Sequence, residues 1–394
     1  MQKRTVRVIA LLWLVPILSL GFRAQSSSDA EKAQVLMQRG AVLMDEKKAD
    51  LAQPILRQAA TLAPSSALAF YFLGSAEMTL GKYTAAQEAM QTALRLDDLN
   101  PGLLRKQRRE AQDILALAFA NQKEYAKARA AYEAALAKDP DYPGFSYNLA
   151  CVCALAGDRA AALSALRTAL TNDAKADSGR SLPDPAADED LKGLWGDPVF
   201  LAVLMASQGP QPNDGPGGGL ARQGAGRLAA GDAAGAVELL KSSLEIAPSM
   251  VRGWFVLGGA LEAQGKHTEA AEKFKKALAL NVAPNAILSK PAVRYASLRV
   301  GHSLLSDGKP AEAVDALKIG IGADEYYAPL HYEMARAYAG LGDKAQAETS
   351  LKRAAGLAIQ LSALDPPLPD PTRDPAFAKW AKDPDWLEFL NSAS

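Results

Sequence analysis

The sequence predicts an all-α fold, an α-solenoid of about eight helix pairs in two tandem quartets, each followed by a tail rich in proline and aromatic residues. Three observations predict it: the composition favours helices, a spacing of small and large side chains recurs along the chain, and the whole arrangement occurs twice. With 394 residues, 49% of them hydrophobic and 22% charged, the chain is long enough to bury a substantial core.

The first element of the repeat is a turn followed by an alanine. In six segments a glycine separates two amphipathic stretches, where it can take the left-handed conformation that ends a helix. These glycines are Gly81, Gly157, Gly231, Gly265, Gly308 and Gly342. An alanine stands five residues after each glycine, and two further segments keep the alanine without the glycine. The eight alanines are Ala52, Ala86, Ala128, Ala162, Ala236, Ala270, Ala313 and Ala347.

The second element is a small residue paired with a large one. Twelve residues before each alanine stands Gly40, Gly74, Ala116, Ala150, Gly224, Gly258, Gly301 or Ala335. Four residues after it stands Leu56, Met90, Tyr132, Leu166, Leu240, Phe274, Leu317 or Leu351. Because small residues let two helices approach closely and a large one fills the space beside them, each segment is predicted to be a packed helix pair.

This pattern resembles that of the tetratricopeptide repeat family, which reads W-x2-L-G-x2-Y, then A-x3-F, then P. The fullest match runs through Trp254, Leu257, Gly258, Ala270 and Phe274. Other segments lack the tryptophan or the closing proline, so the resemblance is carried by the array rather than by one repeat. It implies stacked helix pairs whose first helices line a concave surface that grips peptides, in a chain that is not an enzyme.

The array is itself duplicated. Segments begin at residues 33, 67, 109 and 143 and again at 217, 251, 294 and 328, so each quartet carries an insertion between its second and third members. Each quartet also ends in a similar tail: residues 182–185 and 368–371 both read Leu-Pro-Asp-Pro, while Trp195, Asp197-Pro198 and Phe200 resemble Trp380, Asp383-Pro384 and Trp386. We therefore expect a first quartet plus tail over residues 27–206, a Gly/Pro linker over 207–219 and a second quartet plus tail over 220–394. The tails are expected to cap the last helix pair, with ligand binding as the alternative.

Residues 1–26 are predicted to be a secretory signal peptide. Lys3, Arg4 and Arg7 precede an apolar run over residues 8–22 that is short for a bilayer-spanning helix. Small residues at Ala24 and Ser26 place cleavage near residues 24–26. We expect a periplasmic or secreted protein with no integral membrane span after cleavage. The alternative is that the segment stays uncleaved as an anchor that tethers the same domain outside the inner membrane.

The sequence carries no motif typical of catalysis, a metal site or a cofactor. Its 44 basic and 44 acidic residues balance, which gives no reason to expect nucleic acid as a partner. His267, His302 and His331 lie in separate segments, and Cys151 and Cys153 point to different faces of one predicted helix. A basic run over residues 105–109 fits a solvated helix face better than an anion site. We expect no cofactor and no catalytic residue.

Side chains of the first helices are the candidates for peptide binding. Taking residues beside the packing stripe selects Met37, Tyr71, Met78, Tyr147, Phe255, Tyr295, His302, Tyr332 and Arg336. Aromatic and methionine side chains provide large, adaptable contact areas, so a protein or peptide partner containing apolar or aromatic residues is expected. The alternative, about as well supported for any one of them, is core between repeats.

The function predicted from these features is a non-catalytic exported scaffold or adaptor that binds protein or peptide ligands through the concave faces of its repeats. One alternative is a structural subunit of an envelope assembly, in which apolar faces pack on sister chains. A less favoured alternative is a cell-wall hydrolase on a helical-repeat frame, which would need a pair of carboxylates across a cleft.

Overall fold

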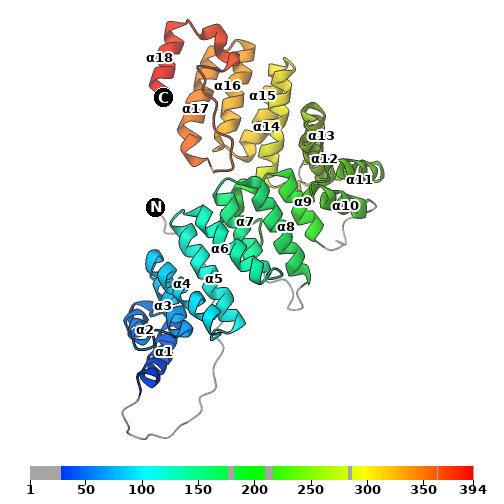
Figure 1. Cartoon of the computed structure of the whole chain (residues 1–394). Coiled ribbons are helices and arrows are strands. Elements are labelled where there is room, and N and C mark those ends of the chain that lie inside the picture. Colours follow the sequence, from blue (N-terminus) through cyan, green and yellow to red (C-terminus); the bar gives the residue numbers. More distant parts are fainter. Residues whose placement is uncertain are drawn as a thin grey trace. The chain divides into compact units, whose positions relative to one another are not determined.

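The computed structural model describes residues 28–175, 182–208, 215, 217–282, 286–361 and 363–393, and it confirms the all-α array of helix pairs (Figure 1). The predicted signal peptide and most of the predicted linker lie outside the described residues. The pairs are α1 (Asp29–Asp45) with α2 (Ala49–Leu62), α3 (Ala67–Thr79) with α4 (Tyr83–Leu99), α5 (Arg105–Asn121) with α6 (Tyr125–Lys138), α7 (Pro143–Leu155) with α8 (Arg159–Lys175), α10 (Gly218–Ala229) with α11 (Ala233–Ile246), α12 (Val251–Ala263) with α13 (His267–Leu280), α14 (Lys290–Ser306) with α15 (Pro310–Ala323), and α16 (Ala328–Leu341) with α17 (Lys344–Leu357).

Each quartet is followed by a tail made of a short 3-10 helix and a final α-helix. The first tail is η1 (Glu189–Leu194) and α9 (Pro198–Ser207). The second tail follows a single 3-10 turn, η2 (Ala358–Gln360), and consists of η3 (Pro375–Trp380) and α18 (Pro384–Ala393).

Residue contacts divide the chain into two compact units, Met1–Ala135 and Leu136–Ser394, and each is described by itself. Within the second unit, α9 packs against α8 on one side and against α10 and α12 on the other. Helices before and after the predicted linker therefore touch each other, while the boundary predicted at residues 207–219 stays a prediction.

The turns inside the helix pairs adopt the left-handed conformation expected of them. The six glycines of these turns have φ angles between 70° and 87°. In the two segments that lack glycine, Lys47 and Lys123 take the same conformation, with φ angles of 60° and 62°. A left-handed conformation costs a residue with a Cβ about 1–2 kcal/mol, so these two turns are strained and the glycine turns are not.

The small and large positions of the repeat pack as predicted. A Cβ atom on Gly40 would lie 2.3 Å from Leu56 Cδ2, and one on Gly258 would lie 2.6 Å from Phe274 Cε1. Only a residue without a side chain lets the two helices of these pairs approach so closely. The eight alanines of the repeat are at most 2% exposed, so the sequence pattern marks the core of each pair.

First helices lie on the inner side of the array. Within the first unit α1 contacts α3 and α3 contacts α5, and within the second unit α14 contacts α16. Successive second helices of the described chain, such as α2 and α4 or α13 and α15, make at most slight contact. Helices that lie closer together stand on the inside of a bend, so α1, α3 and α5 line the concave side of the first unit, and α14 and α16 lie on the inner side of their part of the second unit.

Every helix in the part of the chain that the structure describes is too short or too polar to cross a membrane.

Candidate protein-binding surfaces

Tyrosine hydroxyls on first helices donate hydrogen bonds to carboxylates of a neighbouring first helix. Tyr71 of α3 donates to Glu110 of α5 in the first unit, and Tyr295 of α14 donates to Glu262 of α12 over 2.6 Å in the second. Burial is the main cause that raises the pKa of both hydroxyls well above its usual value. The hydroxyls therefore stay protonated at neutral pH, and each bond fastens one repeat to the next.

Arginine, glutamate and histidine side chains line the first helices of the second unit from α12 to α16. Arg299 Nε lies 2.8 Å from Glu262 Oε1, Arg336 Nη1 lies 2.8 Å from Glu333 Oε1, and His302 Nδ1 lies 3.3 Å from the same Glu333 oxygen. We call these five residues the charged strip. Its donors are outermost, because the side chains of Arg299 and His302 are 45% and 56% exposed while those of Glu262 and Glu333 are 17% and 12% exposed. The strip presents nitrogen donors to solvent above carboxylates that are already paired.

Four of the residues predicted to bind a peptide are buried instead. Tyr71, Tyr147, Phe255 and Tyr332 are each 8% exposed or less. All four occupy the fifth position of their segments, and that position faces the next repeat or tail: the Phe255 ring, for example, lies 6.3 Å from the Tyr295 ring of α14. The alternative interpretation, core between repeats, describes these four side chains.

The other predicted site residues reach the surface. Met37 of α1 and Met78 of α3 are half-buried on first helices of the first unit, and Tyr295, His302 and Arg336 line the second unit's first helices. That these five contact a peptide stays a prediction.

Three members of the charged strip were not singled out from the sequence: Glu262, Arg299 and Glu333. The repeat itself carries the signal that finds two of them. Arg299 and Glu333 stand at the same position of successive segments, three residues before His302 and Arg336. Comparing charges at equal positions of adjacent repeats therefore reveals the strip, whereas a search for aromatic residues does not.

Each tail is attached to its quartet through a tyrosine on the first helix of the quartet's last pair. Tyr147 of α7 donates to Asp188 Oδ2 over 2.8 Å, and Tyr332 of α16 donates to Asp374 Oδ2 over 2.9 Å. Each aspartate also accepts a backbone N–H of its own 3-10 helix, so it caps that helix as well. The two tails thus repeat one attachment.

A second attachment joins each tail to the second helix of the same last pair. Arg159 Nη2 of α8 donates to Asp197 Oδ1 over 2.8 Å, and Lys344 Nζ of α17 donates to Asp383 Oδ2 over 2.7 Å. Between these fixed points, apolar side chains of the tails close the open end of the last pair. Those with 2% exposure or less are Leu191, Leu194, Phe200, Ala202 and Val203 in the first tail and Phe377 and Trp386 in the second.

The described part of the chain holds no group of three or more His, Cys, Asp or Glu side chains placed to bind a metal ion. Both cysteines are buried thiols on α7 and form no disulfide with each other. Burial, with the nearby Asp188 carboxylate, raises the pKa of the Cys151 thiol well above its usual value. A thiol of this kind stays protonated and is a poor nucleophile.

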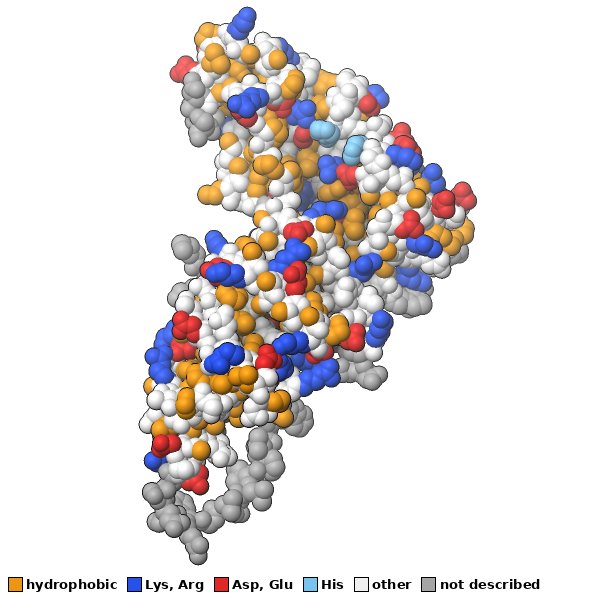
Figure 2. Space-filling model, viewed as in Figure 1, with side chains coloured by type: hydrophobic (Ala, Val, Ile, Leu, Met, Phe, Trp, Pro, Cys, Tyr) orange, Lys and Arg blue, Asp and Glu red, His pale blue; other side chains and the backbone are white. Residues whose placement is uncertain are grey.

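The basic run over residues 105–109 has a structural partner. Arg108 pairs with Asp97 and Asp98 at the end of α4. Asp97 Oδ1 also accepts the backbone N–H groups of Gly102 and Leu103, each over 2.8 Å, and so closes the insertion between the second and third pairs. On the face of the molecule that Figure 2 shows, basic and acidic side chains are interspersed rather than separated by sign.

Comparison with known proteins agrees with the repeat pattern. Family models described as tetratricopeptide repeats match residues 37–101, 119–182, 222–286 and 328–358, together more than half of the chain. No curated protein matches the sequence.

Several solved structures are similar at low identity. The crystal structure of MamA protein is 18% identical over 64% of this chain and 92% of that one, with a TM-score of 0.29. The C-terminal part of a TPR repeat-containing protein from Cytophaga hutchinsonii is 13% identical over 73% and 95%, with a TM-score of 0.39. A complex of the TPR2AB domain of yeast Sti1 with pHSP90 is 15% identical over 82% and 99%, with a TM-score of 0.28. Such low TM-scores assign no role to any residue of this chain.

Proposed function

The chain belongs to the tetratricopeptide repeat family, and from this premise we propose that it is a non-catalytic, exported scaffold that binds protein or peptide partners on its first helices. The observation that supports the proposal is the charged strip on α12, α14 and α16, where partly exposed nitrogen donors stand together on first helices. The exposed groups of the strip already have a charged neighbour, so they add more to the specificity for a binding partner than to the affinity for it. Such specificity is what a surface that selects among partners needs.

The two units offer different chemistry to a partner. In the first unit the half-buried Met37 and Met78 offer adaptable apolar contacts, which fit the apolar or aromatic ligand that the sequence predicts. In the second unit the strip favours a segment that carries carboxylates or backbone carbonyls able to accept from Arg299 and His302.

Site-specific photo-cross-linking tests the proposal. A photoreactive amino acid replaces Met78 on α3 or His302 on α14, and the full chain is irradiated in a native envelope extract. Matched controls carry the same amino acid at Gln91 of α4 and Lys276 of α13, which are exposed positions on second helices. We expect one discrete adduct from the first-helix positions and none from the controls. Equal adducts from both sets of positions, or none from either, would reject binding through the concave surface.

Export rests on the basic and apolar pattern of residues 1–26. The test is the mass of the N-terminal peptide of the protein recovered from the periplasm or medium. A mature N-terminus near residues 25–27 supports a cleaved signal peptide. An intact N-terminus in the membrane fraction indicates the uncleaved anchor, and full-length protein in the cytoplasm refutes export.

A further inference from the structure

The two tails match residue by residue, with a constant offset between equivalent positions. Asp188 and Asp374 each receive a tyrosine hydroxyl, and Asp197 and Asp383 each receive a basic side chain. The same offset brings Leu191 onto Phe377 and Phe200 onto Trp386, all buried. The tails are therefore two versions of one structure, and a difference between them at an equivalent position carries information.

One such difference is the indole of Trp195, because the equivalent position of the second tail holds no tryptophan. Trp195 follows η1 directly, and its Nε1–H donates a hydrogen bond to the Pro185 carbonyl oxygen over 3.0 Å. The ring is half-buried and packs against the cluster that contains Leu191 and Phe200. In the second tail the equivalent residue is Ala381, and the equivalent of Pro185 is Pro371.

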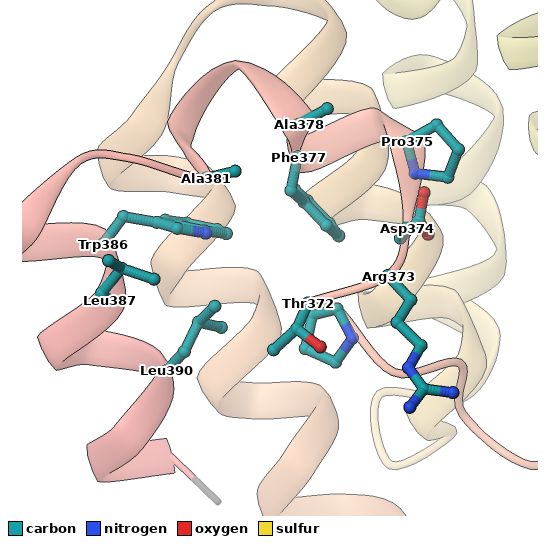
Figure 3. Close-up of a pocket in the computed structure, with 11 residues that line it drawn as sticks. Thr372, Arg373, Asp374, Pro375, Phe377, Ala378, Ala381, Trp386, Leu387 and Leu390 are labelled. Atoms are coloured by element: carbon teal, nitrogen blue, oxygen red, sulfur yellow. The ribbon is translucent and has the colours of Figure 1, made fainter.

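The second tail has a pocket where this indole would lie. It has a volume of about 180 Å³ and is lined by residues that include Pro371, Phe377, Ala381, Trp386, Leu387 and Leu390 (Figure 3). Figure 3 shows Phe377, Trp386 and Leu390 around the opening, with Arg373 at its edge. Pro371, Phe377, Trp386 and Leu390 are the equivalents of Pro185, Leu191, Phe200 and Leu204, which bond Trp195 or belong to the same cluster as Trp195, and Ala381 is the equivalent of Trp195 itself.

The pocket has the chemistry of an indole site. Most of its lining residues are aromatic or aliphatic, which suits a large flat ring, and Thr372, Arg373 and Asp374 form its polar side. The Pro371 carbonyl accepts no hydrogen bond from any described residue, so it is left to take the N–H of an indole as Pro185 does. The side chain of Arg373 is 88% exposed, long enough to lie over a bound ring as a cation–π partner.

We propose that the pocket of the second tail binds the tryptophan side chain of a partner protein, in the way the first tail binds its own Trp195. The site lies on the tail and not on the concave surface, so it goes beyond the proposed function and is tested separately. The indole in the first tail, that of Trp195, is part of a polypeptide. This favours a tryptophan within a protein segment as the ligand of the second tail, over free indole or free tryptophan.

Fluorine NMR of the full chain tests for the site. The probe is 5-fluoroindole, and its competitors are N-acetyl-tryptophanamide, free L-tryptophan and N-acetyl-leucinamide. We expect one indole site with a dissociation constant in the millimolar range, as befits a small fragment. N-acetyl-tryptophanamide should displace the probe at lower concentration than free tryptophan, and the leucine amide should not displace it. No binding at millimolar probe, or equal displacement by leucine amide, overturns the proposal, and tighter binding of free tryptophan overturns a protein segment as the ligand.

Two variants decide whether the pocket is the one inferred. Ala381→Trp places an indole in the pocket from its own chain and should weaken probe binding at least 10-fold. Trp195→Ala opens the equivalent slot in the first tail and should raise the stoichiometry from one site to two. Unchanged binding by a folded Ala381→Trp chain refutes the location. If circular dichroism shows that this variant disturbs the tail, Trp195→Ala still decides, because no second site would then mean that the tails are not equivalent.

Discussion

The contact between Gly259 of α12 and Pro198 of α9 gives the sharpest test of how the first tail meets the second quartet. A Cβ atom on Gly259 would lie 2.3 Å from Pro198 Cβ and 2.8 Å from its Cγ. Ordinary contact begins near 3.4 Å, so Gly259→Ala must move the two helices apart by about 1 Å. The proline ring has no rotamer that removes the overlap, in contrast to a leucine or methionine at such a contact.

The expected magnitude follows from two opposing terms. Overpacking against a rigid neighbour costs about 2–3 kcal/mol, and part of the dispersion energy along the separated interface is lost as well. Alanine in a helix interior is favoured over glycine by about 1 kcal/mol. We therefore expect Gly259→Ala to destabilise the second unit by about 1–2 kcal/mol.

The assay is urea unfolding followed by circular dichroism, with Gly322→Ala on α15 as the matched control. Gly322 is also helical, but a Cβ there would meet no atom within 4 Å, so the control should gain up to about 1 kcal/mol. Hydrogen exchange should show the loss at α9 and α12 and leave α16 and α17 unchanged. A Gly259→Ala chain that gains as much stability as the control would refute the close contact between the first tail and the second quartet.

Three further predictions follow from single residues. Replacing Lys47 or Lys123 with glycine relieves a left-handed conformation and should raise the free energy of unfolding by up to about 1 kcal/mol each, measured by urea unfolding; a decrease would contradict the turn geometry. Because burial raises the pKa of the Cys151 thiol, iodoacetamide at pH 8 should leave it unmodified in the folded chain and modify it in urea, as read by mass spectrometry. The Lys344 ammonium and the backbone N–H of Trp386 lower the pKa of Asp383 in the folded chain. The stabilisation that Asp383 gives the second tail is therefore complete above the unfolded pKa of ~4 and is lost as the pH falls through the lower folded pKa. Tryptophan fluorescence should shift to the red over that window in the parent but not in Asp383→Asn.

The helix pairs were predictable because their determinants lie close together in the sequence. Gly258 and Phe274 meet within one pair, and the turn at Gly265 lies between them. Each requirement recurs in every segment, so a departure at one position, such as Lys47 in place of glycine, does not hide the pattern.

The inner surface was harder to predict because two stripes of a first helix are close in angle. The fifth position of a segment, which holds Tyr332, and the ninth, which holds Arg336, are four residues apart and differ by only about 40° around the helix. Periodicity does not tell which of the two faces the next repeat. The structure does: Tyr332 is 2% exposed and bonds Asp374 of the tail, while the side chain of Arg336 is 25% exposed on the charged strip.

The tails show the limit of matching residues by type. Matching by residue type pairs Trp195 with Trp380. Trp380 is the last residue of η3, however, and Leu194 is the last residue of η1, so the equivalent of Trp380 is Leu194. The equivalent of Trp195 is Ala381, and only this alignment reveals the missing indole. The two Leu-Pro-Asp-Pro runs and the two Asp-Pro pairs have this same offset in the sequence, and the attachment points Asp188 and Asp374 confirm it through partners about 40 residues away on α7 and α16.

The remaining differences between the tails follow from what lies beyond each of them. In α9 the outward positions Val199 and Ala202 pack against the second quartet, and Gly196 before the helix lies so close to α14 that a Cβ would come within 2.4 Å of the Pro291 carbonyl oxygen. The equivalent residues of the second tail are Asp385, Glu388 and Lys382, all exposed. An end cap needs a polar outer face, while a helix inserted between two quartets needs apolar or small residues on both sides. The first tail therefore packs between two quartets, while the second tail caps its quartet with a polar outer face. The first tail fills the position with its own Trp195, whereas the second tail leaves the equivalent pocket open on a surface that a partner can reach.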